Sequence, residues 1–348
     1  MHGNQIQGDT MTDQPAAETL ESYLLDYWES IASGMLKKRG RHRVLRRIDE
    51  HQLHETVSYA RRPTAPVNTV NLVVVDTETT GLDPDHDEVV EIAARPVTIV
   101  EPLDPKDSCP AALASHQQPA FVGRREPGVP MSEGAAKVTG ISTEALAGQA
   151  IDEAALRKVF DGVDLVVAHN ARFDRAMCIN LWPWMADLDW ACSDRDIGWR
   201  DFGAHSHNLQ ALANWQGFYF EGAHGAEADV QALLHTLAVP VLTGEPPETP
   251  FDPHPTTTGF AELLRSWNAG TVRVFAWGSP FHTKDRLRLR GYRWDPGYRV
   301  WFRDMLGPAP SDDAPLGTEM QAEAEWLAAE CSVTAPEFRG LSNQERWA

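Results

Sequence analysis

Two carboxylates stand directly after an apolar run that is typical of a buried strand. The run ends in Val73-Val74-Val75 and is followed by Asp76, Thr77 and Glu78. Successive side chains of a strand point to opposite faces, so Asp76 and Glu78 would share one face and could hold one cation together. Alone this is weak support, since a D-x-E triplet occurs by chance about once in a few hundred residues.

Two further segments supply side chains that suit the same chemistry. Asp174 follows the apolar segment 165–168 and is expected on the first turn of a helix. His224 and Asp229 lie five residues apart beside another helical-looking segment, so a loop histidine can lean over a helix-borne carboxylate. Carboxylate oxygens suit Mg²⁺ or Mn²⁺, and two such ions about 3.5–4 Å apart can clamp the attacking and leaving oxygens of a phosphodiester.

The elements that must position these side chains alternate between strands and helices. Apolar runs predict buried strands at 72–75, 88–100 and 165–168, and the intervening patterns predict helices at 152–160 and 171–181. This alternation predicts an α/β layer fold. An isolated aspartate at a strand end or helix start is more often a cap than a ligand, but the joint spacing of the carboxylates argues against that reading here.

The motifs and their order resemble those of the DEDDh 3′-to-5′ exonucleases, a family that includes the proofreading epsilon subunit of bacterial DNA polymerase III. The resemblance covers about residues 68–240 and implies a ribonuclease H-like mixed β-sheet flanked by helices. One departure is Gly225, where stand-alone epsilon-like exonucleases tend to have an arginine. The segments that carry the resemblance are Val75–Leu82, Val138–Ile141, His169–Asp174 and His224–Asp229.

The resemblance also implies roles for individual side chains. We expect two Mg²⁺ or Mn²⁺ ions, with Asp76 shared between them. The unperturbed pKa of histidine, about 6.5, suits removal of a proton from an attacking water near neutral pH, so His224 is the expected general base. The expected metal ligands are Asp76, Glu78, Asp174 and Asp229, and the residues expected to meet the 3′-terminal nucleotide or to shape its site are Thr79, Thr80, Leu82, Asn170 and Phe173.

Charge is distributed unevenly along the chain. The formal net charge of -19 argues, taken alone, against a partner as anionic as nucleic acid. However, residues 68–240 hold 26 acidic and 11 basic side chains, whereas residues 256–305 hold 9 basic and 4 acidic ones. A basic run without acidic residues also spans Lys37–Arg47, which is typical of a phosphate-binding stripe and equally of a solvated helix face. The total charge is therefore a poor guide to the partner.

Composition divides the chain into five expected segments. The fourth is rich in both basic and aromatic side chains, which suits single-strand binding but also suits the core of a small module or a protein-docking role. The expected segments are a helical N-terminal extension with the basic run (1–67), the exonuclease domain (68–240), a proline-rich linker (241–258), a small α+β module (259–305) and an acidic, partly helical tail (306–348).

No stretch approaches the roughly 18–20 apolar residues of a membrane span, and the four cysteines form no CxxC pair. We therefore expect no membrane association, neither a zinc site nor a disulfide framework, and a cytoplasmic location. These observations exclude the membrane and disulfide-scaffold classes and leave a globular protein.

Together the sequence predicts a metal-dependent enzyme that releases nucleoside monophosphates from DNA 3′ ends, acting alone or with a DNA polymerase in replication or repair. The same site could instead process RNA, as oligoribonuclease-like relatives do, because sugar discrimination depends on contacts around the terminal 2′ position. A hypothesis of another class is a non-catalytic polymerase-docking or nucleic-acid-binding protein. The five intact catalytic positions argue against it.

Overall fold

The computed structural model describes residues 45–48, 67–102, 112–113, 119–221, 224–243, 256–308 and 316–347. The expected N-terminal helix, most of the basic run Lys37–Arg47 and most of the proline-rich linker lie outside these residues. Among the helices that are described, none is long and apolar enough to cross a membrane.

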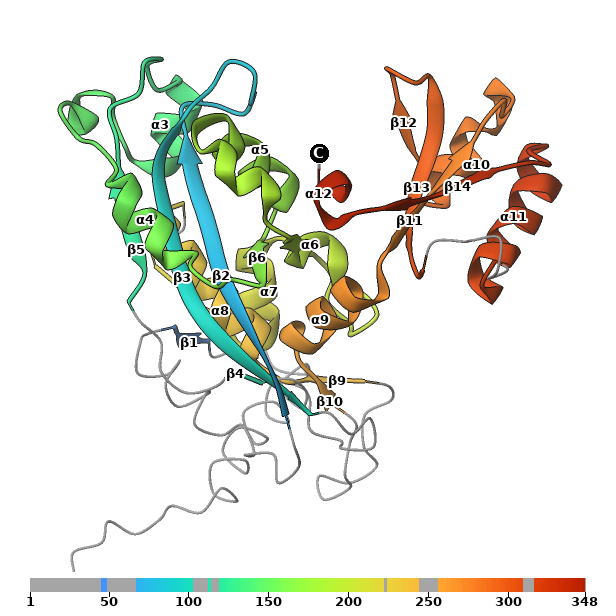
Figure 1. Ribbon diagram of the computed structural model, residues 1–348, viewed down its shortest axis with the longest axis horizontal. Helices are drawn as coiled ribbons and strands as arrows, with labels where there is room; N and C mark the ends of the chain where they lie inside the picture. Colours follow the sequence, from blue (N-terminus) through green and yellow to red (C-terminus); the bar gives the residue numbers. More distant parts are fainter. Residues whose placement is uncertain are drawn as a thin grey trace, which may run out of the picture.

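A mixed sheet forms the centre of the larger part of the molecule (Figure 1). Strands β2 (Val67–Thr79) and β3 (Val89–Pro102) form a long antiparallel pair, and β6 (Leu165–Ala168) and β7 (Trp190–Cys192) continue the sheet in parallel from β2. The valine-rich run of β2 is buried because both faces of the sheet are covered. The short strands β4 (Ala112–Leu113) and β5 (Phe121–Arg124) pair with β3.

Helices pack on both faces of this sheet. Val73 and Val75 face α4 (Glu153–Val159) and α5 (Ala171–Leu181), whereas the alternate residues of β2 face α7 (Leu209–Gln216) and α8 (Ala226–Ala238). This arrangement confirms the predicted α/β fold with a mixed sheet flanked by helices. Shorter elements connect these layers: α3 (Glu133–Thr139), η2 (Glu144–Leu146), η3 (Pro183–Asp187) and α6 (Ser193–Asp196).

The end of the N-terminal extension joins this part of the molecule. Strand β1 (Arg46–Arg47) pairs in parallel with β8 (Phe218–Tyr219), and the amide of Ile48 donates a 2.7 Å hydrogen bond to the carbonyl of Tyr219. Ile48 is buried in the same core as α7 and α8. The last residues of the basic run thus lie at the edge of the larger part.

A second, smaller sheet has the strand order β12-β13-β11-β14 and is antiparallel throughout. Strands β11, β12 and β13 together with α10 give residues 271–305 the α+β character that the sequence predicts. The expected separate tail differs from the structure, because α11 and β14 complete this module. The helix contributes Leu327 and Cys331 to the core under the sheet. The bounds are β11 (Thr271–Ala276), η4 (Phe281–Thr283), α10 (Lys284–Leu289), β12 (Arg293–Asp295), β13 (Val300–Leu306), α11 (Thr318–Cys331) and β14 (Glu337–Leu341).

The helix before this module packs on the larger part of the molecule and not on the small sheet. Helix α9 (Gly259–Ala269) falls in the segment expected to form the small module, but its Phe260, Leu263 and Leu264 are buried in the same core as α8. Its strongly one-sided apolar face is covered by α8, which is why it joins the larger part. Before it, β9 (Val241–Leu242) and β10 (Thr256–Thr257) pair antiparallel.

The chain finally returns to the larger part through residues 342–347, which we call the C-terminal strap. The strap contains α12 (Asn343–Arg346), and Trp347 is buried against the sheet, where its Nε1 donates a 2.7 Å hydrogen bond to the carbonyl of Trp190. Arg346 forms an ion pair with the buried Asp196. The small module is therefore held at two points, through α9 and through the strap (Figure 1).

Candidate active site

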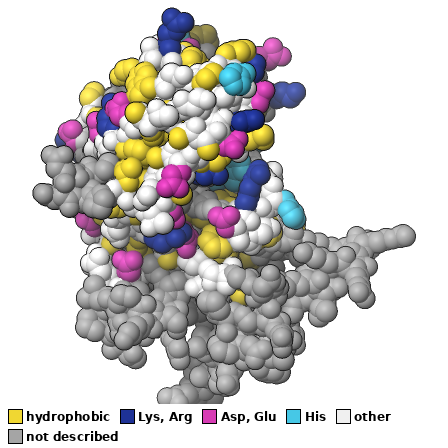
Figure 2. All heavy atoms as spheres, turned by 90° about the vertical axis from the view of Figure 1, so that its right-hand side faces the viewer, with side chains coloured by type: hydrophobic (Ala, Val, Ile, Leu, Met, Phe, Trp, Pro, Cys, Tyr) yellow, Lys and Arg dark blue, Asp and Glu magenta, His cyan; other side chains and the backbone are white. Residues whose placement is uncertain are grey.

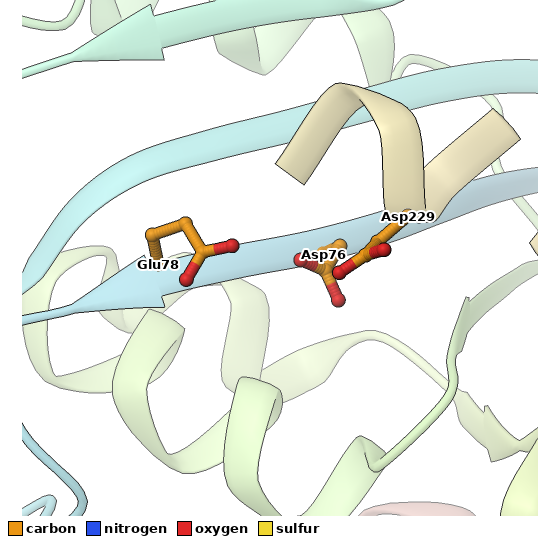
Figure 3. Close-up of side chains that lie close together, drawn as sticks. All are labelled: Asp76, Glu78 and Asp229. Atoms are coloured by element: carbon orange, nitrogen blue, oxygen red, sulfur yellow. The ribbon is translucent and has the colours of Figure 1, made fainter. Parts of the chain in front are cut away.

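Three predicted ligands meet beside the carboxyl end of β2. Asp76 and Glu78 project from the strand on one face, and Asp229 reaches them from the first turn of α8 (Figure 3). Each carboxylate offers one oxygen within 4.8 Å of those of the other two. Strand alternation brings Asp76 and Glu78 together, and α8 packs on the same face, which is why Asp229 joins them.

Asp174 approaches from the opposite face of the sheet. It lies in the first turn of α5, and its Oδ1 accepts a 2.8 Å hydrogen bond from Oγ1 of Thr77, which alternates with Asp76 and Glu78 along β2. The hydrogen bond from Thr77 therefore holds Asp174 on the face of the sheet opposite to the other three carboxylates, yet its charge still raises the pKa of Asp76. It lies next to the other three carboxylates without belonging to their tightest cluster.

The cluster perturbs the pKa of every carboxyl group in it. Burial and then the charges of neighbouring carboxylates hold the pKa of Asp76 well above its usual range and raise the pKa of Glu78 to about 8. Burial also raises the pKa of Asp174 to about 7 and that of Asp229 to about 6. Without a counter-charge, such groups repel one another and retain protons near neutral pH.

A fifth carboxylate, Glu91, escaped the sequence analysis. It is the β3 partner of Glu78 and is almost fully buried. Its Oε1 accepts a 3.1 Å hydrogen bond from the amide of Ala226 at the start of α8, and its other oxygen pairs with Arg124. The only available signal was an acidic residue inside the apolar run of β3. Glu91 thus ties the helix that carries Asp229 to the sheet.

The predicted general base precedes α8. The amide of His224 donates a 3.2 Å hydrogen bond to Oδ2 of Asp229, so the backbone of the histidine is fixed beside the cluster. His224 has a φ of 70°, an uncommon value for a residue other than glycine. Its side chain is exposed, as a group that exchanges protons with solvent and substrate requires.

The residues expected to meet the terminal nucleotide have different surroundings. Leu82 is 85% exposed on the loop after β2, where a ligand can reach it. Thr80 does not fit that role: it is fully buried, and its Oγ1 donates a 2.9 Å hydrogen bond to Asp87 and accepts one from the amide of Glu88. The Thr80 side chain therefore joins the two ends of the loop between β2 and β3. The Thr79 hydroxyl donates to the carbonyl of Gly81.

The two predicted residues of the second motif flank Asp174. The carbonyl of Asn170 accepts hydrogen bonds from the amides of Phe173 and Asp174, which begin α5, and the Asn170 side chain is exposed. Phe173 is half-buried and packs against the core on the α5 side of the sheet. Asn170 is therefore accessible to a ligand, while Phe173 supports the wall of the site.

The chemistry of the donor set fits divalent cations. Hard cations such as Mg²⁺ and Mn²⁺ prefer oxygen ligands, and here the buried Glu78 and the half-buried Asp76 and Asp229 face one another with raised pKa values. A bound cation would offset this repulsion. Asp76, Glu78 and Asp229 would hold it, with Asp174 beside them.

Comparison with known proteins identifies the domain that carries this site. Residues 73–237 match the model of the RNase_T family, which is described as an exonuclease. These residues, just under half of the chain, are therefore similar to an exonuclease domain, and we call them the exonuclease domain. This match supports the predicted enzyme class. The exonuclease domain includes β2, α5 and α8, and thus every element that carries a carboxylate of the cluster.

The exonuclease domain also resembles solved structures. One is E. coli ExoI in complex with single-stranded DNA, at 19% identity and a TM-score of 0.38 over 49% of this chain and 40% of that chain. Another is Exonuclease X in complex with 5′-overhanging duplex DNA, at 22% identity and a TM-score of 0.32 over 47% of this chain and 89% of that chain. The match thus spans about two fifths of ExoI. No curated protein matches the sequence.

Proposed function

We propose that this protein is a metal-dependent 3′-to-5′ exonuclease that removes nucleoside monophosphates from DNA 3′ ends with two Mg²⁺ or Mn²⁺ ions. The observation that carries the proposal is the meeting of Asp76, Glu78 and Asp229 inside an exonuclease domain, with Asp174 behind them. The charges of the other three carboxylates all raise the pKa of Asp76, so Asp76 is the candidate ligand shared by both ions.

In the proposed reaction, the oxygen of a water attacks the terminal phosphodiester, and the bond to the 3′ oxygen of the preceding nucleotide breaks. Bound divalent ions would supply charge stabilisation to the attacking and leaving oxygens. The four carboxylates would hold the ions. An imidazole nitrogen of His224 accepts the proton of the attacking water, and its backbone is held beside Asp229 for this purpose.

The test compares wild type with Asp76→Ala and His224→Ala on labelled single-stranded DNA and RNA in Mn²⁺. Loss of a general base typically costs about 10²–10⁴-fold in rate, and loss of a shared ligand should cost at least as much. The matched controls are Asp161→Ala and His282→Ala, which remove the same side-chain types away from the cluster. Equal DNA degradation by wild type and both test variants would refute the assignment.

Label position reports the direction of attack. A 5′-labelled strand should yield a ladder of shortening products, whereas a 3′-labelled strand should release the labelled mononucleotide first. The opposite pattern would contradict the proposed polarity. Activity confined to RNA would transfer the assignment to an exoribonuclease, and binding without hydrolysis by any preparation would favour a non-catalytic docking or binding protein.

We also propose a cytoplasmic location and a DNA polymerase as a partner in replication or repair. The cysteines Cys178, Cys192 and Cys331 are free and buried, which is compatible with a reducing compartment. Cell fractionation and co-purification with the replicative polymerase test these two points separately from the activity. Recovery from an oxidising compartment would refute the first, and absence of the polymerase from the purified material would refute the second.

A further inference from the structure

The basic residues of the small module separate onto two faces of its sheet. On the face covered by α10 and α11, acidic residues of α11 neutralise them: Arg286 pairs with Glu330, and both Arg290 and Arg303 pair with the buried Glu323. Figure 2 shows basic and acidic side chains intermixed on this side of the molecule. The helix-covered face therefore presents little unbalanced positive charge.

The helix-free face of the same sheet carries arginines laid on aromatic rings. Strand pairing places Arg293, Phe302 and Phe275 in one row across β12, β13 and β11. The guanidiniums of Arg273 and Arg293 lie 4.4 Å and 4.9 Å from the centroid of the Phe302 ring. The aromatic surface continues to Trp277, which stacks on Phe275 at 5.7 Å and is 41% exposed.

This face turns toward the exonuclease domain. The strap follows β14 and packs on β7. Hydrogen bonds from Ser342 lower the pKa of Glu345 in the strap. The positive charges of Arg339 and Arg273 on the small sheet lower this pKa further. Burial lowers the pKa of Arg293, and the charges of Arg195 and Arg172 in the exonuclease domain lower it further. Guanidiniums from both parts of the molecule therefore approach one another.

Arginines and carboxylates both lie where the two parts approach: Glu337 shares the helix-free face with Arg293, and Glu345 lies near Arg273. Arg273 and Arg293 both donate to Asp304, at 2.7–3.0 Å. Across from them, Arg195 pairs with Asp194 at 2.9 Å, and Arg172 begins the helix that carries Asp174. Arg273 and Arg293 thus share the single carboxylate of Asp304. Arg195 and Arg293 keep 58% and 44% of their side chains exposed, so both can take an external anion.

We propose that the helix-free face of the small sheet, together with Arg172 and Arg195 of the exonuclease domain, binds the phosphodiester backbone of a single-stranded nucleic acid whose end lies at the carboxylate cluster. This inference rests on the proposed function. Arginine suits the task because its planar fork pairs with phosphate oxygens in a bidentate manner. Trp277 adds a ring on which a base can stack.

The test measures binding without hydrolysis. Fluorescence anisotropy in EDTA compares a labelled 20-nucleotide strand with a 3-nucleotide strand for wild type, Arg195→Ala and Arg293→Ala. Each variant should weaken binding of the long strand several-fold and leave the short strand unchanged. The slope of log affinity against log salt should fall by about 0.7 for each phosphate that the variant no longer neutralises.

The matched control is Arg286→Ala, which removes one arginine from the same module on the helix-covered face. It should bind both strands as wild type does. An unchanged salt slope in both Arg195→Ala and Arg293→Ala would overturn the proposal, since Arg195 is an exposed residue whose loss leaves the fold intact. Arg293→Lys keeps the charge but loses the bidentate fork, so it should bind the long strand more weakly with the wild-type salt slope, which separates charge loss from damage to the sheet.

Hydrolysis of a nitrophenyl ester of thymidine monophosphate distinguishes this inference from the proposed function. This substrate reaches only the carboxylate cluster, so wild type and the control variant Arg286→Ala should cleave it equally. No cleavage by wild type of this ester or of any nucleic acid would refute the proposed function. Cleavage by wild type, together with unaltered long-strand binding by Arg195→Ala and Arg293→Ala, would refute only the backbone-binding face.

Discussion

Glu91 and Ala226, 135 positions apart in the chain, are joined by a 3.1 Å hydrogen bond from the amide of Ala226 to the Glu91 carboxylate. This bond fixes the start of α8 against the sheet at the level of Glu78. The helix that carries Asp229 is therefore positioned by a residue that need not touch the substrate.

We expect Glu91→Gln to lower activity about 10–100-fold, the range for residues that orient metal ligands. The side-chain oxygen of the glutamine can still accept a hydrogen bond from the backbone amide of Ala226, but the negative charge that pairs with Arg124 is gone. A metal titration should show weaker Mg²⁺ binding, whereas a merely structural role would lower thermal stability without changing the metal dependence. Glu101→Gln, at the far end of the same strand, is the control and should leave both unchanged.

Asp76→Asn should abolish activity yet stabilise the metal-free protein. Asp76 is surrounded by Asp174, Asp229, Glu78 and Glu91, and its removal relieves their repulsion. Thermal unfolding at pH 8 in EDTA should therefore show a higher Tm than wild type. Addition of Mg²⁺ should raise the Tm of wild type but not of the variant. A metal-free Tm well below that of wild type would contradict this electrostatic account.

Stability without metal should depend on pH in a defined direction. The pKa of Glu78 is raised to about 8 and that of Asp229 to about 6, whereas unfolded carboxyl groups titrate near 4. A group whose folded pKa is raised stabilises the fold below its unfolded pKa, and this contribution is lost as the pH rises through the folded value. The difference in Tm between Mg²⁺ and EDTA samples should therefore grow from pH 5 to pH 8. A difference that is constant over this range would be incompatible with the raised pKa values.

Arg346→Ala should destabilise the protein by about 3–5 kcal/mol, because it leaves the charge of Asp196 buried without its partner. The side chains of Arg346 and Asp196 are 9% and 1% exposed. Denaturant unfolding measures the loss. The double variant with Asp196→Asn should recover much of it, since the orphaned charge is then gone; a double variant as unstable as Arg346→Ala would point to packing rather than charge.

Local patterns predicted most of the candidate site. Alternation along one strand is enough to place Asp76 and Glu78 together, whereas the expectation that Asp229 joins them came from the resemblance to exonucleases. The surroundings of Thr80 were not predictable, because its burial depends on a loop that closes through Asp87, seven residues later. Glu91 was missed for a similar reason, since its partner Ala226 is remote in sequence.

The fold was predictable to a similar extent. Apolar runs located β2, β3 and β6, which are local features. Which core α9, α11 and β14 join could not be predicted from local sequence. Each has an amphipathic or short pattern that could pack against several partners, and only the tertiary packing selects one of them. The acidic residues of α11 are an example, because as a sequence they read as a solvated tail and in the structure they pair with arginines of the module.

Because of the strap, cutting the chain at the expected domain boundary would damage the exonuclease domain. A fragment that stops at residue 240, where the sequence suggests a boundary, lacks α9 and Trp347 and would uncover the apolar surfaces that they occupy beside α8 and β7. Its Asp196 would lose Ser266 and Arg346 as partners. Weak activity in such a fragment would report a damaged exonuclease domain, so the role of the small module is better measured by point substitutions in the full chain.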